Sequence, residues 1–532
     1  MNSSFSSIKK YLKDTLDAYS LDTHSIRMAR FLRKIKNPKL GQQQILVEAG
    51  QPKSNQLALS IFLPIAQKYL GAHSVFYEVG TNSFFPKLKT LIRQFCSPIN
   101  HLAGAKFLYI GMPKSPSVKI EELIDQFQIS SNTPELIEDI EYREIVIGDL
   151  IYDTYLRRTN LPTIDLGSIV FRQILAEAIS LVDFWFYHFA KGNVTAVCVS
   201  HCVYLGAIPA RVGVHFGIHV FQVNTQAIYR VTAEYPHAYT EFVNYREEFL
   251  KLPNGIRKNG LALAQERLYL RFSGEIAVDM PYSTKSAYSL GSQPTNSVIR
   301  KSERLKVLIA VHDFFDSPHS YGNNFYPDFY IWLQRLNELS LKVNYDWYIK
   351  THPDIQGPGE MVLKEFLVHS NDFTLIPSDT SHHDLIRDGI DCVLTVFGTI
   401  AMEYPYLGKT VVNASRVNPH VAYNFSITPM DKIEYENTIL NLKDFCSHAI
   451  NKEEILEYYF MHNIQRLQNW VFLDPERLLD EIGGYDESNS SKIYSYFLLG
   501  QNRWSNADYQ HAISAFLRSS EIRLNYDHFN VT

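Results

Sequence analysis

The feature that most constrains the fold is the alternation of short apolar segments with helical segments in the C-terminal half of the chain. Strand-like apolar segments occupy residues 307–311, 346–350, 373–376, 391–396 and 410–414. Helical patterns lie between several of them, at residues 329–339, 361–369 and 383–388. Strands that alternate with helices form a parallel sheet, because parallel neighbours need a long crossover connection. The sequence therefore predicts a doubly wound α/β domain in this half.

The N-terminal half shows the same alternation. Strands are predicted at residues 45–50, 73–80, 195–201 and 218–224, and helical segments at residues 57–70 and 204–217. The spacing of the last two strands and the segment between them suits a right-handed βαβ crossover. We therefore expect a parallel sheet in this half as well.

The stretch between the two halves is rich in Ser, Thr, Gly, Pro and charged residues and has little periodicity, as linkers between domains do. We predict one α/β domain at residues 1–285, a linker at 286–305, a second α/β domain at 306–483 and a helical tail at 484–532. Two Rossmann-like domains joined in this way face each other across a cleft, which is the usual place for a ligand.

The tail resembles a single tetratricopeptide-type helical hairpin. The positions that carry this likeness are Tyr496, Leu499, Gly500, Tyr509, Ala512, Phe516 and Ser519. One repeat cannot bury its own apolar face. We therefore expect either that the hairpin packs on the body of the protein or that the chain belongs to a longer one.

Composition narrows the classes of protein. The 51 basic and 56 acidic residues give a net charge of −5, so no general attraction to nucleic acid is expected. The five cysteines are scattered without a CxxC pair, which argues against disulfides and structural zinc, and no metal is predicted.

The N-terminus lacks the apolar core of a signal peptide. The longest apolar stretch, residues 194–223, contains Arg and His residues that are costly in a bilayer. We expect a cytoplasmic protein, with peripheral membrane contact left open.

The first candidate binding residues follow the predicted strand at residues 346–350. Lys350 and His352 stand at its carboxyl end, where open α/β sheets bind ligands, and both side chains can donate hydrogen bonds to a phosphate. The alternative is that His352 only caps the strand and bonds to a neighbouring carbonyl.

A second candidate is the turn after the strand at residues 391–396. Gly398 allows close approach to the backbone, and Thr399 opens a short helix whose free N–H groups favour an anion. Glu403 follows one helical turn later, where its carboxylate could accept hydrogen bonds from ribose hydroxyls. The alternative is an ordinary βαβ turn with Glu403 in solvent.

A third candidate is the loop that follows the strand at residues 307–311. It combines His312, Asp313, Asp316 and His319, and a carboxylate there could act as nucleophile or base. The alternative for Asp316 is an Asx turn with its own backbone. In the first domain, the weaker candidates are Glu48, Glu78, Asp149, Asp153 and His201. The sequence contains no HExxH, P-loop, GxSxG or GxGxxG motif, which removes support for proteases, nucleotide triphosphatases and dehydrogenases of those types.

The motifs HDFFDSPH, YIKTHPD and LTVFGTIAMEYPYLGKTVV, in this order, resemble the capsule polysaccharide biosynthesis glycosyltransferases, a group that includes retaining Kdo transferases with CMP-sugar donors. IGDLIYDTYLR and VSHCVYLGAIPARVGVHFGIHVFQV look like the acceptor-side segments of that family. The resemblance covers about 300 residues. It implies a GT-B architecture with an N-terminal acceptor domain and a C-terminal domain for the nucleotide sugar.

The same resemblance implies that His352, Gly398, Thr399 and Glu403 hold the nucleotide and that Asp316 or Asp313 lies near the anomeric carbon. From their places along the chain and their chemistry, we further expect Lys350 at the nucleotide, His319 at the sugar, and His312 and His201 among the catalytic residues. On the same grounds, Glu48, Glu78, Asp149 and Asp153 are expected to face the acceptor. The Kdo transferases carry an acidic run followed by Ala-Ser where this chain reads DFFDSPH, so the donor sugar and the choice between the two Asp stay open.

With this resemblance, we expect a metal-independent glycosyltransferase without a cofactor. The product retains configuration if Asp316 attacks the anomeric carbon, which is the favoured outcome, and is inverted if Asp316 only activates the acceptor hydroxyl. The donor would be a CMP-linked or other nucleotide sugar, with Kdo or another nonulosonate-type acid as the sugar, and the acceptor a capsule or lipopolysaccharide-type glycan or glycolipid. The tail could reach a membrane or protein partner. Two alternatives stay open: a CDP-alditol phosphotransferase of teichoic-acid type, which shares the Lys-x-His-Pro motif, and a non-catalytic scaffold with a partner-binding tail.

Overall fold

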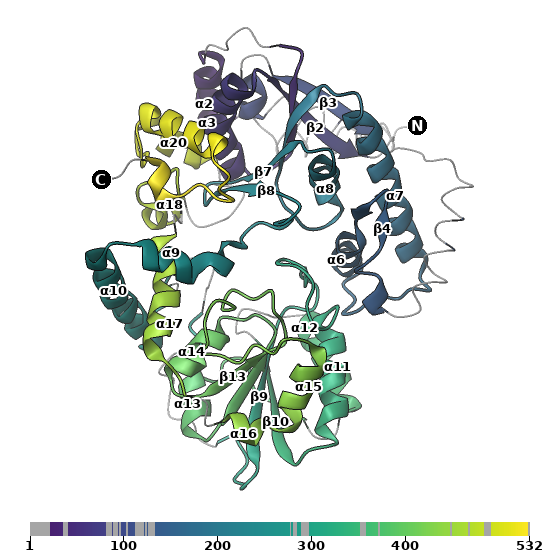
Figure 1. Ribbon diagram of the computed structural model, residues 1–532, viewed down its shortest axis with the longest axis vertical. Coiled ribbons are helices and arrows are strands. Elements are labelled where there is room, and N and C mark those ends of the chain that lie inside the picture. The colour runs from purple at the N-terminus through teal and green to yellow at the C-terminus, as the bar shows by residue number, and fades with distance from the viewer. Residues whose placement is uncertain are drawn as a thin grey trace, which may run out of the picture.

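The protein consists of two α/β lobes, each built around its own sheet (Figure 1). The computed structural model describes residues 22–35, 41–80, 88, 94, 97–102, 105–111, 122, 125, 134–276, 278–279, 285–288, 297–351, 358–370, 373–446, 449–466, 469–482 and 491–529. The predicted fold class, with two Rossmann-like units that face each other as in the GT-B architecture, is confirmed.

The sheet of the first lobe has six strands in the order β3-β2-β1-β6-β7-β8. The strands are β1 (Gln44–Glu48), β2 (His73–Gly80), β3 (Lys106–Gly111), β6 (Val194–Val199), β7 (His219–Val223) and β8 (Ile228–Val231). All neighbours are parallel except β7 and β8, which form an antiparallel pair. Leu46 of β1 lies opposite both Val75 and Val197, so the apolar centre of β1 is buried between its neighbours. The four predicted strands of this half are confirmed.

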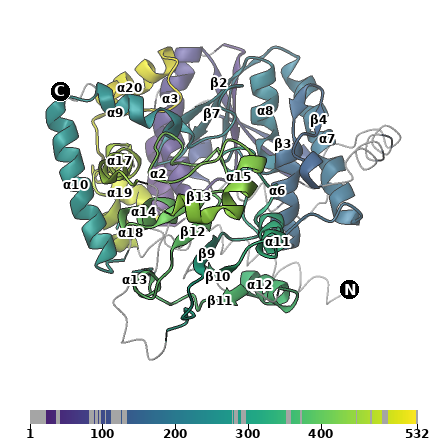
Figure 2. The same ribbon diagram turned by 60° about the horizontal axis from the view of Figure 1, so that its bottom comes forward.

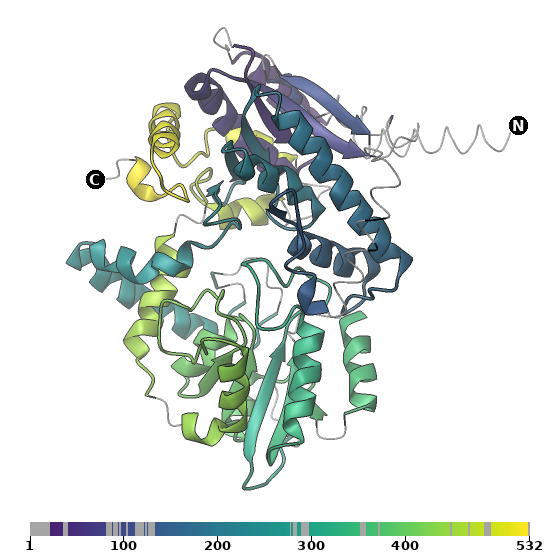
Figure 3. The same ribbon diagram turned by 45° about the vertical axis from the view of Figure 1, so that its right-hand side comes forward.

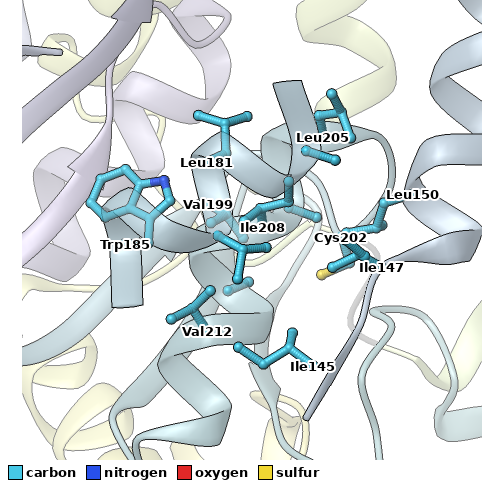
Figure 4. Packing of buried hydrophobic residues seen from close by; sticks show 14 of the residues in the cluster. Ile145, Ile147, Leu150, Leu181, Trp185, Val199, Cys202, Leu205, Ile208 and Val212 are labelled. Carbon is cyan, nitrogen blue, oxygen red and sulfur yellow. The ribbon is translucent and has the colours of Figure 1, made fainter. Parts of the chain in front are cut away.

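Helices cover both faces of this sheet. They are α2 (Thr23–Arg33), α3 (Lys53–Leu70), α6 (Gly148–Thr159), α7 (Ile169–Phe189) and α8 (Ile208–His215), and a small hairpin of β4 (Glu141–Tyr142) and β5 (Ile145–Val146) precedes α6. The Ser168 side chain caps α7 by accepting from the Phe171 N–H. Figure 4 shows part of the core between α6, α7 and α8, where Trp185 packs with Ile208 and Leu181. Trp185 is fully buried, and its removal would cost about 3–5 kcal/mol.

The sheet of the second lobe has five parallel strands in the order β11-β10-β9-β12-β13. They are β9 (Leu305–Val311), β10 (Tyr345–Thr351), β11 (Phe373–Leu375), β12 (Cys392–Thr395) and β13 (Thr410–Asn413). The connecting helices are α11 (Phe329–Ser340), α12 (Pro358–Val368), α13 (His382–Arg387) and α14 (Ile400–Tyr406), followed by α15 (Lys432–Leu440) and α16 (Leu442–Phe445). This is the alternation that the sequence predicts. Asp328 caps α11 by accepting from the Ile331 N–H at 2.7 Å.

The chain crosses between the lobes more than once. The helices α9 (Tyr245–Lys251) and α10 (Asn254–Phe272) come before the second sheet, yet they pack on α17 (Lys452–Tyr459) and the π-helix at Phe460–Gln465 (Figure 2). Met402 of α14 belongs to the same apolar cluster. The predicted boundaries of the domains stay predictions, and residues 280–284 and 289–296, around the predicted linker, lie outside the described residues.

The end of the chain returns to the first lobe. After α18 (Pro475–Ile482), the helices α19 (Lys492–Leu498) and α20 (Asn506–Arg518) pack on α2 and α3, as Figure 3 shows for the yellow segment. Tyr509, Ala512 and Phe516 are buried there, within the same core as the residues of α3. The tail therefore buries its apolar face on the body of the protein, while its likeness to a tetratricopeptide repeat stays a prediction. Within the described part of the chain, we find no helix with the length and apolar character that a membrane span requires.

Candidate functional site

The first lobe contacts the second through the loop after β6 and through α6, which bond to the segment that follows β9. In the first sheet, the strand order reverses direction between β1 and β6, and in the second sheet between β9 and β12. In open α/β sheets, ligands bind beyond the carboxyl ends of the two strands at such a switch point. The segments that follow these four strands hold Glu48, residues 200–207, residues 312–328 and residues 396–399. Most of the residues singled out from the sequence therefore lie at the two switch points.

The loop after β9 and the turn after β12 lie side by side, because β9 and β12 are neighbouring parallel strands. His312 Nε2 lies 3.3 Å from Thr395 Oγ1 and accepts a hydrogen bond from the Phe397 N–H at 3.4 Å. The imidazole also stacks on the ring of Phe329, with 4.6 Å between the ring centroids. A Cβ at Gly398 would lie 2.9 Å from Thr395 Oγ1, so only glycine fits this turn without a shift. The structure thus places His312 directly against the turn at Gly398.

Glu403 was expected either to face a ligand or to lie in solvent, but in the structure it bonds to protein groups. It is buried, and its Oε1 accepts from the Arg271 guanidinium of α10 at 3.1 Å, while its Oε2 accepts from the Tyr288 hydroxyl at 2.8 Å. Thr399 also bonds to this carboxylate. Burial raises the pKa of Glu403, but Arg271 and these hydroxyls outweigh burial and hold the pKa below its ordinary value. In this structure, the carboxylate is occupied by protein donors, and its contact with a ribose stays a prediction.

Lys350 is buried within the second lobe. Its Nζ donates to the Ser378 carbonyl at 2.8 Å, beyond the end of β11. Burial lowers the pKa of Lys350 to about 8, although Asp379 opposes this shift. His352, the residue expected to share the phosphate with Gly398, lies outside the described residues. The roles of both residues in nucleotide binding stay predictions.

The loop after β9 presents one exposed carboxylate to the first lobe. Asp313 accepts from the Phe315 N–H at 3.1 Å, as in an Asx turn. Asp316 is exposed, and its Oδ1 accepts from the Ser317 N–H at 2.9 Å and from the Tyr204 hydroxyl at 3.3 Å. Tyr204 belongs to the loop after β6 in the other lobe. The Asp316 carboxylate therefore lies where the two switch points approach each other.

Tyr204 has an unusual backbone conformation. Its φ of 60° and ψ of 173° fall in a region that is essentially reserved for glycine. Burial raises the pKa of its hydroxyl to about 12, and the nearby Asp316 carboxylate adds to this shift. Such a conformation costs about 1–3 kcal/mol and persists only where surrounding contacts hold it. The strain therefore marks the loop after β6 as a candidate functional element.

His319 connects the lobes instead of lining an open space. The side chain is fully buried, and its Nδ1 lies 2.5 Å from Asp153 Oδ1 and its Nε2 2.6 Å from Glu138 Oε1. Burial lowers the pKa of His319, but the two carboxylates outweigh burial and raise the pKa well above 6.5. The imidazole is thus a charged bridge between the loop after β9 and the first lobe. Its predicted contact with the sugar stays a prediction.

The carboxylates of α6 face this bridge. Burial raises the pKa of Asp153 to about 6, while His319 acts in the opposite direction. Asp149 lies one turn earlier and forms a buried ion pair with Arg211 of α8 at 2.5 Å, with His237 at 4.0 Å from the same carboxylate. Both residues are paired within the protein, so a role in acceptor binding stays a prediction for each.

The remaining candidates line the edge of the first sheet. Glu48 ends β1, and its Oε2 accepts from the Ser200 N–H at 2.6 Å, beside the exposed His201. Burial raises the pKa of Glu48, although the bonds to Ser200 oppose the shift. Glu78 of the adjacent β2 accepts from the Gln94 amide at 2.8 Å. Glu48 and His201 therefore stand together at the switch point of this sheet.

Sequence reasoning missed several residues that shape the site. Tyr204, Arg271, Tyr288, Glu138 and Arg211 all hold the candidate residues in place, and each lies far along the chain from its partner. Tyr204 and Arg211 lie in the segment quoted for its likeness to an acceptor-side segment, but no local signal indicates the partners of these residues or the positive φ of Tyr204.

Comparisons with known proteins add only distant likenesses. No protein-family model matches the chain, and no curated relative matches it. A UDP-GlcNAc 2-epimerase from Neisseria meningitidis shares 13% identity over 86% of this chain and 100% of its own, with a TM-score of 0.24. A putative UDP-N-acetylglucosamine 2-epimerase from Listeria monocytogenes shares 12% identity over 92% of this chain and 100% of its own, with a TM-score of 0.24. A glycosyltransferase from Rickettsia africae shares 12% identity over 86% of this chain and 99% of its own, with a TM-score of 0.23. Likenesses at this level carry no argument about function, and the fold class follows from the strand order of the chain itself.

Proposed function

We propose that the protein is a glycosyltransferase that moves a sugar from a nucleotide donor to a glycan acceptor in the gap between its lobes. The observation that supports this proposal most strongly is the contact of Asp316 with Tyr204. It joins the switch point of one sheet to that of the other and leaves a carboxylate exposed between them. Two sheets that face each other by their ligand-binding edges suit a reaction with two large substrates, one held by each lobe.

The second lobe would hold the nucleotide. Gly398 allows a phosphate to approach the backbone, and the N–H groups of Thr399 and Ile400 have no acceptor within the helix that they open. Because α14 has only 7 residues, its dipole is small, and direct hydrogen bonds from these N–H groups would contribute more than the dipole to phosphate binding. His312 beside the turn and His352 beyond β10 would donate to the phosphate and stabilise the leaving group.

Asp316 would act on the anomeric carbon. As a nucleophile, it would form a covalent glycosyl intermediate and the product would retain configuration, which is the outcome that we favour. As a base, it would take the proton of the acceptor hydroxyl and the product would be inverted. The Tyr204 hydroxyl, which donates to Oδ1, would fix the orientation of the carboxylate in either case.

The first lobe would hold the acceptor at the ends of β1 and β6. Glu48 has a raised pKa and lies beside His201, a combination suited to a general base for the acceptor hydroxyl. The resemblance noted from the sequence supports a CMP-linked donor, with Kdo or a related nonulosonate-type acid as the sugar, and a bacterial surface polysaccharide as the acceptor. We further propose that the reaction needs no metal ion. It would take place at the inner face of the cytoplasmic membrane.

A calorimetric titration with CMP, CDP, UDP and GDP tests the proposal against its alternatives. A preference for CMP supports the transferase, whereas a preference for CDP favours an alditol phosphotransferase. Failure of all four nucleotides to bind would leave the scaffold as the better account. Replacing Gly398 by Val should abolish the binding, since even its Cβ would meet Thr395 Oγ1. Gly255, where an added Cβ meets nothing within 4 Å, provides the matched control in Gly255→Ala.

A further inference from the structure

We propose a second anion-binding site, for a phosphate monoester or free phosphate, in a pocket where the C-terminal tail meets the crossing segments. The pocket has a volume of about 190 Å³, and its charged lining consists of Arg267, Asp279, Arg466 and Arg503. We call it the arginine pocket. It is separate from the proposed nucleotide site, whose residues do not line it.

The three guanidinium groups come from three parts of the chain. Arg267 lies on α10, Arg466 follows the π-helix, and Arg503 precedes α20 in the tail. The helix α10 packs on the second lobe, whereas α20 packs on the first. The arginine pocket is therefore lined by residues of segments that pack on different lobes. Figure 1 shows α10, α17 and α20 on the same side of the molecule.

The guanidinium groups are only partly neutralised. Arg466 Nη1 lies 3.4 Å from Glu241, and its buried Nε has no hydrogen-bond partner in the part of the chain that the structure describes. Arg267 lies 3.7 Å from Asp279. Among the residues that the structure describes, the Arg503 guanidinium forms no ion pair and donates to the Asn469 carbonyl and the Tyr526 hydroxyl, while it also lies over the ring of Trp504.

The charge balance favours an anion. Three cationic groups and one carboxylate line the arginine pocket. Asp279 would repel an anion, but its Oδ2 already accepts from the Tyr459 hydroxyl at 2.8 Å and Arg267 lies near its Oδ1. Grouping three guanidiniums around one space is unfavourable unless an anion offsets the repulsion.

Size and hydrogen bonding indicate a phosphate group. The pocket is smaller than the roughly 300–1,000 Å³ of sites for drug-sized ligands, so a whole nucleotide sugar does not fit. A phosphate monoester carries nearly two negative charges and three acceptor oxygens, which match several guanidinium forks better than one carboxylate does. Tyr526 accepts from Arg503 and keeps its own hydroxyl proton for a ligand.

This site gives the tail a role that the transfer reaction does not require. Arg503 and Tyr526 both come from the tail, which supplies one wall of the arginine pocket. The same phosphate chemistry is found in free phosphate and in the headgroup of an anionic lipid such as phosphatidic acid. A headgroup would place the crossing side of the protein at a membrane surface.

The test is a calorimetric titration of the full chain with inorganic phosphate, together with sedimentation on phosphatidylcholine vesicles with and without phosphatidic acid. We expect Arg503→Gln and Arg267→Gln each to weaken binding about tenfold. Arg518, exposed on α20 and outside the pocket, provides the matched control in Arg518→Gln, which should bind as the native chain does. Thermal melting of each variant shows whether the tail stays folded. If Arg503→Gln unfolds the tail, the binding measured for Arg267→Gln decides the test, because Arg267 lies outside the tail.

The vesicle arm separates the two sources of the phosphate. Binding only to phosphatidic acid vesicles identifies a headgroup site, and binding of phosphate in solution without vesicle binding identifies a site for a soluble phosphate. The proposal is overturned if neither probe binds the native chain. It is equally overturned if folded Arg267→Gln and Arg503→Gln bind as tightly as Arg518→Gln.

Discussion

His319 of the second lobe and Asp153 of the first are joined through Nδ1 and Oδ1 at 2.5 Å, in a position where both side chains are excluded from solvent. Neither lobe alone could bury this pair, since each would leave an ionisable group without its partner. The contact therefore fixes the loop after β9, which carries Asp316, against α6. The position of the candidate catalytic carboxylate depends on this bridge between the lobes.

Replacing His319 by Gln should lower the free energy of unfolding by about 3 kcal/mol at about pH 6, because it leaves two buried carboxylates without a cation. A group whose pKa is raised in the folded state stabilises it below the unfolded pKa of 6.5, and this stabilisation is lost as the pH rises through the folded pKa. The difference between native and variant protein should therefore shrink at alkaline pH. Urea unfolding at several pH values measures it.

The exposed His369, near the end of α12, provides the control in His369→Gln, which should unfold as the native protein does at every pH. A loss of stability in His319→Gln that stays constant or grows as the pH rises would contradict a charged imidazole at position 319.

Replacing Glu403 by Gln should destabilise the protein by about 3 kcal/mol, because the guanidinium of Arg271 would stay buried without its carboxylate. The lowered pKa of Glu403 adds a second expectation. Its stabilisation is present above the unfolded pKa of about 4.5 and is lost as the pH falls through the lower folded value. Chemical denaturation between neutral and acid pH measures both effects. If stability is unchanged while CMP affinity falls, Glu403 binds the ribose and does not stabilise the protein through its ion pair with Arg271.

Glycine is usually less stabilising than alanine at a given position, and the strained backbone at residue 204 predicts the opposite order there. Tyr204→Gly should be more stable than Tyr204→Ala by about 1 kcal/mol, because glycine adopts the observed φ of 60° without strain. Tyr204→Phe should keep the native stability and slow transfer, since only the hydrogen bond to Asp316 is lost. Thermal melting and initial rates test the three variants. Alanine more stable than glycine would show that residue 204 is not strained.

Asp316→Asn should reduce sugar transfer by at least about 10²–10⁴-fold, the range expected when a group that acts in proton transfer is lost. Nucleotide affinity should stay within about twofold of the native value, because the residue is placed at the sugar and not at the phosphate. Asp313→Asn is the matched comparison, since Asp313 bonds to the backbone of its own loop and should retain most of the activity. Rates that are equal in native and Asp316→Asn proteins would remove Asp316 from the mechanism.

The architecture was predictable because it depends on local patterns. Apolar segments such as residues 391–396 and 410–414 lie in β12 and β13, and parallel order follows from the helices between strands. The placement of His312 and Gly398 at the carboxyl ends of strands was predictable for the same reason, whereas the contact between them follows from the pairing of β9 with β12.

The partners of the candidate residues were not predictable. Arg271 meets Glu403 across 132 positions, and Glu138 meets His319 across 181. Such pairs arise from the packing of segments that are distant in sequence, which no local period encodes. For the same reason, no pattern in the sequence indicates that His319 lies between two carboxylates. The return of the tail to α2 and α3 likewise depends on a surface that only the folded first lobe presents.

A crystal structure of the protein with CMP bound tests the central claim most directly. The account predicts the phosphate in the gap between the lobes, within hydrogen-bond distance of the N–H groups after Gly398 and of the His352 imidazole. Nucleotide found elsewhere, or a His352 ring directed away from that turn and packed into the lobe, would contradict the account.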